Sequence, residues 1–150
     1  MIVEVRIEPQ PFDPAREADR LAAGRGDVGA VVSFTGYCRD EGGRLAALEL
    51  DHYPGMAEDE IVRIAREAAT RWPVTGIVVV HRHGLIRPGE AIVTVAAASA
   101  HRKGAFAAAE FMMDYLKTRA PFWKKEHLID GTTGGWVEAK DDDAAAAERW

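Results

Sequence analysis

The sequence predicts an α+β fold: a single domain of antiparallel or mixed β-hairpins packed with helices, of the α/β hammerhead-like type. Most strand patterns follow one another in pairs separated by turns, and helix patterns lie between the pairs rather than after every strand. A chain of 150 residues with 47% hydrophobic content can bury one substantial core and is short for two. We therefore expect residues 1–150 to form one domain.

The first half of the chain contains three strand patterns and two helix patterns. Residues 1–7 alternate apolar and polar side chains, the period of a half-buried strand, and a proline-rich turn ends them. A short helix is expected at residues 15–23. Residues 30–36 and 45–53 fit two strands, which we expect to pair as a hairpin with a long glycine-containing loop. Residues 57–72 repeat apolar side chains at helical spacing until a proline ends the helix.

The second half begins with strand patterns at residues 76–84 and 91–99, which surround a Pro-Gly turn and should form a second hairpin. Residues 101–118 carry the longest helical pattern, and a nearby proline disfavours helical backbone just beyond it. Residues 136–140 fit a last short strand. Residues 141–150 begin with three aspartates, which stabilise a helix amino terminus, so a final helix is expected.

Composition argues against several classes of function. The formal net charge is −5, with 24 acidic and 19 basic residues, which disfavours sequence-independent nucleic-acid binding. No apolar stretch approaches the ~20 residues of a membrane-spanning helix. The chain has one cysteine, and its amino terminus does not resemble a secretion signal. We therefore expect a cytoplasmic protein that binds neither nucleic acid nor membranes.

A cationic stretch, KTRAPFWKKE at residues 117–126, contrasts with the acidic composition. Lys117 falls in the last turn of the long predicted helix, where the helix dipole stabilises a cation by roughly 0.3–1 kcal/mol, so a structural role is one interpretation. A lysine crowded by cations and partly desolvated can instead act as an acid, a base or a nucleophile. If the following segment is extended, Lys124 and Lys125 point to opposite faces, and only one can share a site with Lys117.

Two further positions could bind an anion. His101 and Arg102 lie where a predicted strand meets a helix amino terminus, whose free N–H groups favour a phosphate. A simple cap by Ser99, with two solvated side chains, explains the same pattern. Arg39 lies in a glycine-bearing loop after a predicted strand, where binding groups are often displayed, although a solvated arginine is the simpler interpretation.

Other patterns carry weaker signals. His81 and His83 would project from one strand face, but no cysteine or carboxylate completes a recognised zinc spacing, so we expect no metal site. Cys38 has no base tied to it by a motif, so it is not expected to be a nucleophile. No glycine-rich phosphate-binding signature is present, and no cofactor is expected.

Five segments carry specific motifs: GAVVSFTGYCRD, LELDHYPGMAEDEI, HRHGLIRPGEAIVTVAAASAHRKGAF, FMMDYLKTRAPFWKKE and WVEAK. In this order, from about residue 2 to residue 150, the chain resembles the large, catalytic subunit of molybdopterin synthase, the MoaE family. The resemblance implies a sulfurtransferase of molybdenum cofactor biosynthesis. Such an enzyme converts cyclic pyranopterin monophosphate into molybdopterin by installing two sulfurs as a dithiolene.

The resemblance also implies partners. A small ubiquitin-like sulfur-carrier subunit supplies each sulfur as a thiocarboxylate on its carboxy-terminal Gly-Gly tail. Two large subunits form a central homodimer, and each binds one small subunit, which gives a heterotetramer. The cations of the stretch at residues 117–126 would then attract the thiocarboxylate and the pterin phosphate.

Position in the motifs implies roles for individual residues. Lys117 and Lys124 match the lysines most associated with activity. The residues implied in substrate binding, besides these two lysines, are Tyr37, Cys38, Arg39, His101, Arg102, Lys125 and Glu126. Phe34, Met113 and Lys140 would lie near the site. Lys140 stands where related sequences often carry arginine. A lysine keeps the charge but cannot bind a phosphate in a bidentate manner.

Two other functions fit the same residues. One is a non-catalytic adaptor that docks a ubiquitin-like Gly-Gly tail, which turnover of the pterin would distinguish from an enzyme. The other, less well supported, is metal binding through His81 and His83, which metal analysis of the purified protein would test.

Arg102 and Lys117 are fifteen positions apart in one predicted helix. At a rise of ~1.5 Å per residue their backbones are separated by roughly 22 Å, which a small pterin does not span. We therefore expect a composite active site. Lys117, Lys124 and Arg39 would come from one protomer, and His101 and Arg102 from its neighbour.

Overall fold

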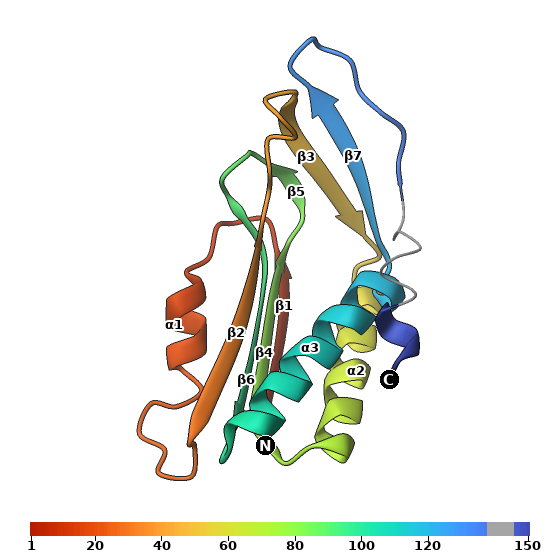
Figure 1. Cartoon of the computed structure of the whole chain (residues 1–150). Helices are drawn as coiled ribbons and strands as arrows, with labels where there is room; N and C mark the ends of the chain where they lie inside the picture. The colour runs from red at the N-terminus through yellow and green to blue at the C-terminus, as the bar shows by residue number, and fades with distance from the viewer. Residues whose placement is uncertain (138–145) are drawn as a thin grey trace.

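Two β-sheets of unequal size form the frame of the protein in the computed structural model, which describes residues 1–137 and 146–150 (Figure 1). In chain order the elements are β1 (Ile2–Glu8), α1 (Pro14–Asp19), β2 (Ala30–Tyr37), β3 (Leu45–His52), α2 (Met56–Arg71), β4 (Val74–Arg82), β5 (Gly84–Ile86), β6 (Ala91–Ser99), α3 (Arg102–Arg119) and β7 (Phe122–Leu128). The mixture of strands and helices confirms the α+β class.

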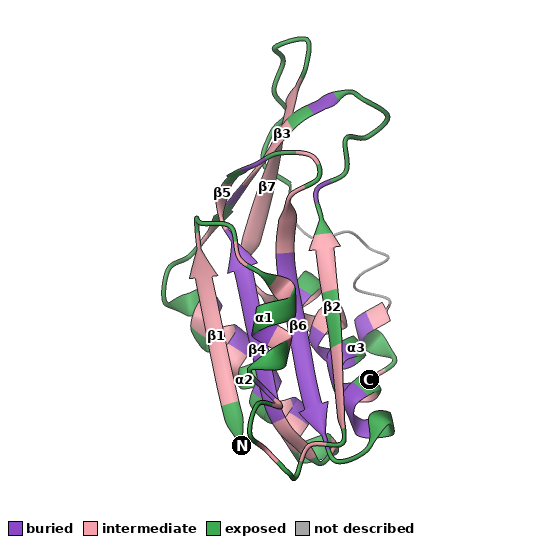
Figure 2. Cartoon of the chain, turned by 90° about the vertical axis from the view of Figure 1, so that its left-hand side faces the viewer, coloured by how far each residue is buried: buried purple, intermediate pink, exposed green. Residues whose placement is uncertain are grey.

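The larger sheet has the strand order β1-β4-β6-β2 and is covered on both faces. Strand β1 runs parallel to β4, and the other neighbours are antiparallel. Helices α2 and α3 cover one face, and α1 lies on the other (Figure 1). Because both faces are covered, the central strands are largely apolar on both sides: Ile77 and Val79 belong to the helical core, whereas Val78 and Val80 pack with Leu21 on the other side. Figure 2 shows β4 and β6 largely buried, while the outer strands β1 and β2 are only partly so.

The smaller sheet, with the order β5-β3-β7, shows that one expected pairing is wrong. Residues 30–36 and 45–53 do form strands, but β2 pairs with β6, and β3 pairs with β5 and β7. Alternation of apolar and polar residues along a strand specifies which face is buried, but it does not specify which other strand it pairs with. The pairing of β2 covers the free edge of β6, and Thr35 Oγ1 lies 3.1 Å from Thr94 Oγ1 across this pair.

The second expected hairpin is confirmed, since β4 and β6 pair antiparallel, with Val79 opposite Val95. Between them the chain leaves the larger sheet as β5. The short helix is α1, which begins where the Asp13 side chain accepts the N–H groups of Ala15 and Arg16 at 3.1 and 3.4 Å. It ends at Asp19, before the expected end, because the following residues form turns.

The carboxy-terminal third differs in part from expectation. Helix α3 ends at Arg119, as its proline predicts, and β7 follows as a strand whose run of charged residues conceals its alternation. Of the expected strand at residues 136–140, Val137 forms an isolated bridge with Lys124, and residues 138–140 lie outside the described range. Residues 146–148 of the expected last helix are helical, and residues 141–145 are outside that range. Within the described residues, no helix has the length and apolar character to cross a membrane.

Gly29 marks a close approach between the start of β2 and the turn into α3. Its N–H donates to the Ser99 carbonyl at 3.0 Å, and a Cβ added there would lie 2.0 Å from the Ala100 carbonyl oxygen. We expect Gly29→Ala to lower the free energy of unfolding by about 1–3 kcal/mol, because the two backbone segments must separate. Urea denaturation measures this change.

Gly26→Ala is the matched control for Gly29→Ala. A Cβ at Gly26 would have no neighbour within 4 Å, and the backbone there is not left-handed. Its effect should stay within about 0.5 kcal/mol. Equal destabilisation by the two substitutions would contradict the packing described at Gly29.

Candidate active site

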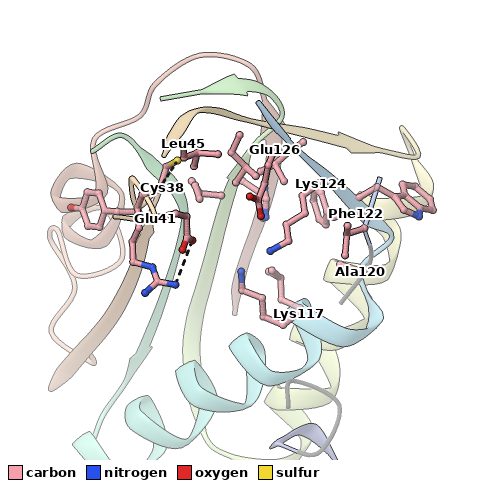
Figure 3. Close-up of a pocket in the computed structure, with 17 residues that line it drawn as sticks. Cys38, Glu41, Leu45, Lys117, Ala120, Phe122, Lys124 and Glu126 are labelled. Carbon is pink, nitrogen blue, oxygen red and sulfur yellow. Dashed lines mark hydrogen bonds and ion pairs between the residues drawn. The ribbon is translucent and has the colours of Figure 1, made fainter. Parts of the chain in front are cut away.

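A cavity of about 430 Å³ lies where the carboxyl end of α3 meets the smaller sheet and the end of β2 (Figure 3). Its walls combine apolar side chains with charged ones. Six of the residues implied in substrate binding line it: Tyr37, Cys38, Arg39, Lys117, Lys124 and Glu126. Segments far apart in the chain therefore supply one site.

The two lysines approach the cavity from different elements. Lys117 lies in the last turn of α3, and Lys124 lies in β7. Between them Ala120 is extended (φ −71°, ψ 129°), as the residue before Pro121 is expected to be, and this turns the chain back toward β3. Figure 3 shows the amino groups of Lys117 and Lys124 directed toward one another in the cavity. Two converging ammonium groups favour an anionic ligand.

The backbone of Lys124 is fixed on both sides. In the pairing of β7 with β3 it lies opposite Leu50. On the other edge, Lys124 N–H donates to the Val137 carbonyl at 3.0 Å, and Val137 N–H donates to the Lys124 carbonyl at 2.8 Å. These bonds set the direction in which the side chain leaves β7.

Lys125 points away from the cavity, as alternation in a strand requires. It does not line the cavity, and its Nζ lies 4.7 Å from the centre of the Trp136 ring. A cation over an aromatic face is stabilised by roughly 0.5–1 kcal/mol at exposed sites, so the structure supplies a packing role for Lys125.

Arg39 and Cys38 lie side by side in sequence but differ in exposure. The Arg39 side chain is 81% exposed at the cavity and lies 3.6 Å from Glu41 Oε1, so little restricts its reorientation toward a ligand. Cys38 is buried, and burial, aided by the charges of Glu41 and Glu90, raises the pKa of its thiol. A raised pKa disfavours the thiolate, which agrees with the expectation that Cys38 is no nucleophile.

The cavity wall contains residues that motif reasoning did not place there, above all His81 and Phe122. His81 is buried in β4, and its ring stacks on Phe122 with centroids 4.0 Å apart. Burial lowers the pKa of His81 to about 3, and the charge of Lys117 acts in the same direction. A histidine within a continuous apolar strand was the available signal, because a polar side chain at such a position must be buried.

The remaining candidates do not line the cavity. Phe34 is 44% exposed on β2, and Met113 is half-buried in α3. His101 caps the start of α3 and Arg102 is its first residue, so both lie at the opposite end of the helix from Lys117. Lys140 lies outside the described residues.

Ser99 assists the start of α3. Its Oγ accepts the His101 N–H at 3.4 Å and donates to the Pro73 carbonyl at 3.0 Å. The side chain of His101 makes no capping hydrogen bond. Hydrogen bonds to backbone groups therefore account for Ser99 at the start of α3, and the side chains of His101 and Arg102 are exposed there.

The histidines do not form a metal centre in the described part of the chain. His83 lies next to His52, with ring centroids 4.8 Å apart, while His81 Nδ1 is held 2.7 Å from the Arg82 carbonyl oxygen. Among residues 1–137 and 146–150, no group of three or more histidine, cysteine, aspartate or glutamate side chains is arranged to hold a metal ion.

Comparison with known proteins gives the family. A model described as MoaE protein matches residues 7–119. The chain belongs to the MoaE family. It is 68% identical to a protein of Mesorhizobium japonicum, over 97% of this chain and 92% of that protein, and 48% identical to one of Escherichia coli, over 98% and 97%. Both MoaE relatives are described as molybdopterin synthase catalytic subunits.

Solved structures of MoaE proteins have the same fold. A molybdopterin biosynthesis MoaE protein from Burkholderia ambifaria superimposes with a TM-score of 0.85 at 46% identity, covering 99% of this chain and 98% of that one. A molybdopterin synthase structure from Staphylococcus aureus gives a TM-score of 0.77 at 33% identity, covering 86% and 95%. The sheets and helices that enclose the cavity thus belong to the family fold.

The buried His81 should make stability depend on pH. Its pKa is about 3 in the folded protein and near the ordinary 6.5 when unfolded, so below pH 6.5 the unfolded chain binds a proton that the folded chain does not. The free energy of unfolding should therefore fall as pH decreases from 6.5 toward 3, by at most about 1.4 kcal/mol per pH unit from this residue. Urea denaturation at several pH values measures the slope.

His81→Asn should make that slope shallower, whereas His83→Asn serves as the control and should leave most of it. The histidine at position 83 is only half-buried. An unchanged slope in His81→Asn would mean that His81 titrates normally in the folded protein.

Proposed function

We propose that this chain is the catalytic subunit of a molybdopterin synthase and that the cavity is its site of sulfur transfer. The substrate would be cyclic pyranopterin monophosphate. The sulfur donor would be the thiocarboxylate at the Gly-Gly tail of a small ubiquitin-like subunit. The observation that carries the proposal is the convergence of Lys117 and Lys124 in one cavity of a MoaE-family protein.

The cavity suits these two anions. At about 430 Å³ it lies within the range of roughly 300–1,000 Å³ that is usual for small-molecule sites. The ammonium groups of Lys117 and Lys124 would attract both the thiocarboxylate and the pterin phosphate, with the exposed Arg39 at the same cavity. A Gly-Gly tail carries no side chains, so it can enter a narrow opening in an extended conformation.

The proposed reaction has two parts for each sulfur. The thiocarboxylate sulfur attacks a side-chain carbon of the pterin, and a C–S bond forms while a C–O bond at that carbon breaks. The displaced oxygen leaves as water or stays on the phosphate, and the partner remains attached through a thioester. Water then cleaves the acyl–sulfur bond, so the sulfur stays on the pterin and the partner leaves as a carboxylate. A second loaded partner repeats the transfer.

Lys117 and Lys124 would have different roles in the reaction. Lys117 would be the central acid, base or electrostatic group, and Lys124 would stabilise negative charge that develops during attack and hydrolysis. Tyr37 and Glu126 line the cavity and are proposed to contact the substrate or the tail. The burial of Cys38 favours a packing role in the wall over direct binding.

The proposed assembly is a central homodimer of this chain with one small subunit bound to each copy, acting in the cytoplasm. The positions of His101 and Arg102 support a homodimer in which each site is shared. They lie on the same helix as Lys117 but at its other end, and neither lines the cavity.

The function is tested by mixing this protein with thiocarboxylated partner and cyclic pyranopterin monophosphate and assaying molybdopterin. We expect product from the wild type and loss of most turnover in Lys117→Ala, with folding and partner binding largely intact, because a helix-end lysine contributes little to stability. Lys124→Ala should also impair turnover. Lys125→Ala is the matched control and should be milder, since Lys125 packs on Trp136 outside the cavity.

Three outcomes would count against this scheme. If the wild type forms no product with a competent partner, the remaining function is the non-catalytic adaptor that only docks the tail. Equal loss of folding and activity in Lys117→Ala would assign that lysine a structural role. A stronger defect in Lys125→Ala than in Lys124→Ala would mean that the reactive lysine is the other one.

The shared site predicts complementation between protomers. Lys117→Ala and Arg102→Ala homodimers should both be inactive, while mixed heterodimers should regain activity, because one of their two sites then receives both intact halves. Differently tagged chains, co-purified and assayed, provide the measurement. Verified heterodimers that stay inactive would exclude a site built from two chains.

A further inference from the structure

Glu41 is an acidic side chain in the wall of a cavity whose proposed ligands are anions. It lines the cavity beside Arg39, and Arg39 Nη2 lies 3.6 Å from Glu41 Oε1. Figure 3 shows Glu41 and Lys124 on different sides of the cavity. The reaction proposed for the two lysines gives the Glu41 carboxylate no role, and a carboxylate at this place repels an incoming anion.

The backbone at Glu41 has a conformation that glycine usually supplies. Its φ is 54°, and Gly42 and Gly43, which follow it, also have positive φ. Asp40 holds this turn, because its side chain accepts the Gly42 N–H at 3.1 Å and its carbonyl accepts the Leu45 N–H at 2.9 Å. A left-handed backbone is strained for a residue with a Cβ. The glutamate side chain, which the turn itself does not require, is therefore the feature to explain.

The ion pair between Arg39 and Glu41 is loose. Its 3.6 Å separation is longer than the roughly 2.7–2.9 Å of a charge-assisted hydrogen bond, and both side chains are exposed. Exposed pairs of this kind contribute little to stability. A phosphate carries more negative charge than a carboxylate and has three oxygens in the geometry that a guanidinium binds, so it can replace Glu41 at Arg39.

We propose that Glu41 is the counter-ion that Arg39 exchanges for the phosphate of the substrate. This inference rests on the proposed function of the site. In the empty cavity Arg39 pairs with Glu41, and in the occupied cavity its guanidinium turns to the phosphate, which it can bind in a bidentate manner. Glu41 acts through Arg39, so it is a positioning residue. Because the pair must break, Glu41 weakens the binding of the anion.

Weaker binding of the phosphate assists turnover. The proposed sulfur transfer leaves the phosphate on the product, so a cation that binds it holds substrate and product alike. Such uniform binding does not accelerate the chemical step, and it slows release of the product. When the phosphate leaves, Arg39 returns to Glu41, which favours release.

Glu41→Gln tests the exchange, because it removes the charge and keeps the size of the side chain. Inorganic phosphate is the probe, and its binding is followed by the shifts of cavity amide signals in ¹H–¹⁵N spectra, without any turnover. We expect E41Q to lower the Kd for phosphate about 2- to 5-fold at low ionic strength, and less as salt is added. In the synthase assay, KM for cyclic pyranopterin monophosphate should fall while kcat does not rise.

The effect of Glu41 should require Arg39. In an Arg39→Gln background, Glu41→Gln should change the Kd less than about 1.5-fold, because no pair remains to be broken. Plain repulsion by the carboxylate would instead give the same gain in both backgrounds.

Glu60→Gln is the matched control for the change in net charge. Glu60 forms an ion pair with Arg63 on α2 and does not line the cavity. Its substitution should leave the Kd for phosphate close to that of the wild type. Circular dichroism at the titration temperature establishes that each variant is folded.

Four results would each overturn the exchange: no binding of phosphate at the wild-type cavity, an unchanged or higher Kd in E41Q, an equal gain in the Arg39→Gln background, or an equal gain in E60Q. A higher Kd would mean that Glu41 presents Arg39 to the ligand. Absence of molybdopterin from the wild type with a competent partner would instead reject the proposed function. The two failures are distinguishable, because the phosphate titration needs neither partner nor turnover.

Discussion

The antiparallel pairing of β7 with β3 is the interaction on which the cavity depends. Helix α3 ends at Arg119, and the chain could continue in many directions from there. Pairing with β3 brings it back across the end of the helix and sets Lys124 opposite Leu50. Lys117 and Lys124 are close in sequence, yet they approach the cavity from a helix and from a strand. A continuous helix would have placed both on one helical face, with no enclosed space between them.

A basic cavity can exist in an acidic protein because charge is unevenly distributed, and several charges elsewhere are paired at the surface. Arg63 forms ion pairs with Glu60 and Glu67 along α2, and Arg149 lies 2.9 Å from Asp114. Such exposed pairs contribute little to stability. They neutralise charge locally, so the net charge of the whole chain does not determine the electrostatic potential inside the cavity. In the cationic stretch itself, alternation in β7 turns Lys125 away from the cavity and Lys124 into it.

The length of α3 has a functional consequence. Its 18 residues place Arg102 and Lys117 near opposite ends, and the buried side chains between them, among them Phe111 and Met112, anchor the helix in the main core. The amino end of the helix favours anions through its free N–H groups, whereas the carboxyl end carries the lysine. One rigid element thus presents two anion-attracting groups that a single small ligand cannot contact together within one chain.

The sequence by itself determined the elements and much of the chemistry. Alternation and helical spacing located most strands and both long helices, and the proline after α3 located its end, because these signals depend on neighbouring residues along the chain. The motif residues around Lys117 and Lys124 identified the family, and alternation predicted that Lys124 and Lys125 diverge. The charged residues of β7 concealed a strand, since polar side chains on both faces remove the usual period.

Only the tertiary structure decided which strands pair and what surrounds the lysines. The pattern of residues 30–36 fits any sheet edge, and the free edge of β6, more than fifty residues away, was the one it covered. His81 was weighed as a metal ligand from its spacing to His83. In the structure it instead contacts Phe122 and the Arg82 carbonyl and forms part of the cavity wall. Burial and partner choice are properties of the folded chain, because they depend on residues that sequence spacing does not bring together.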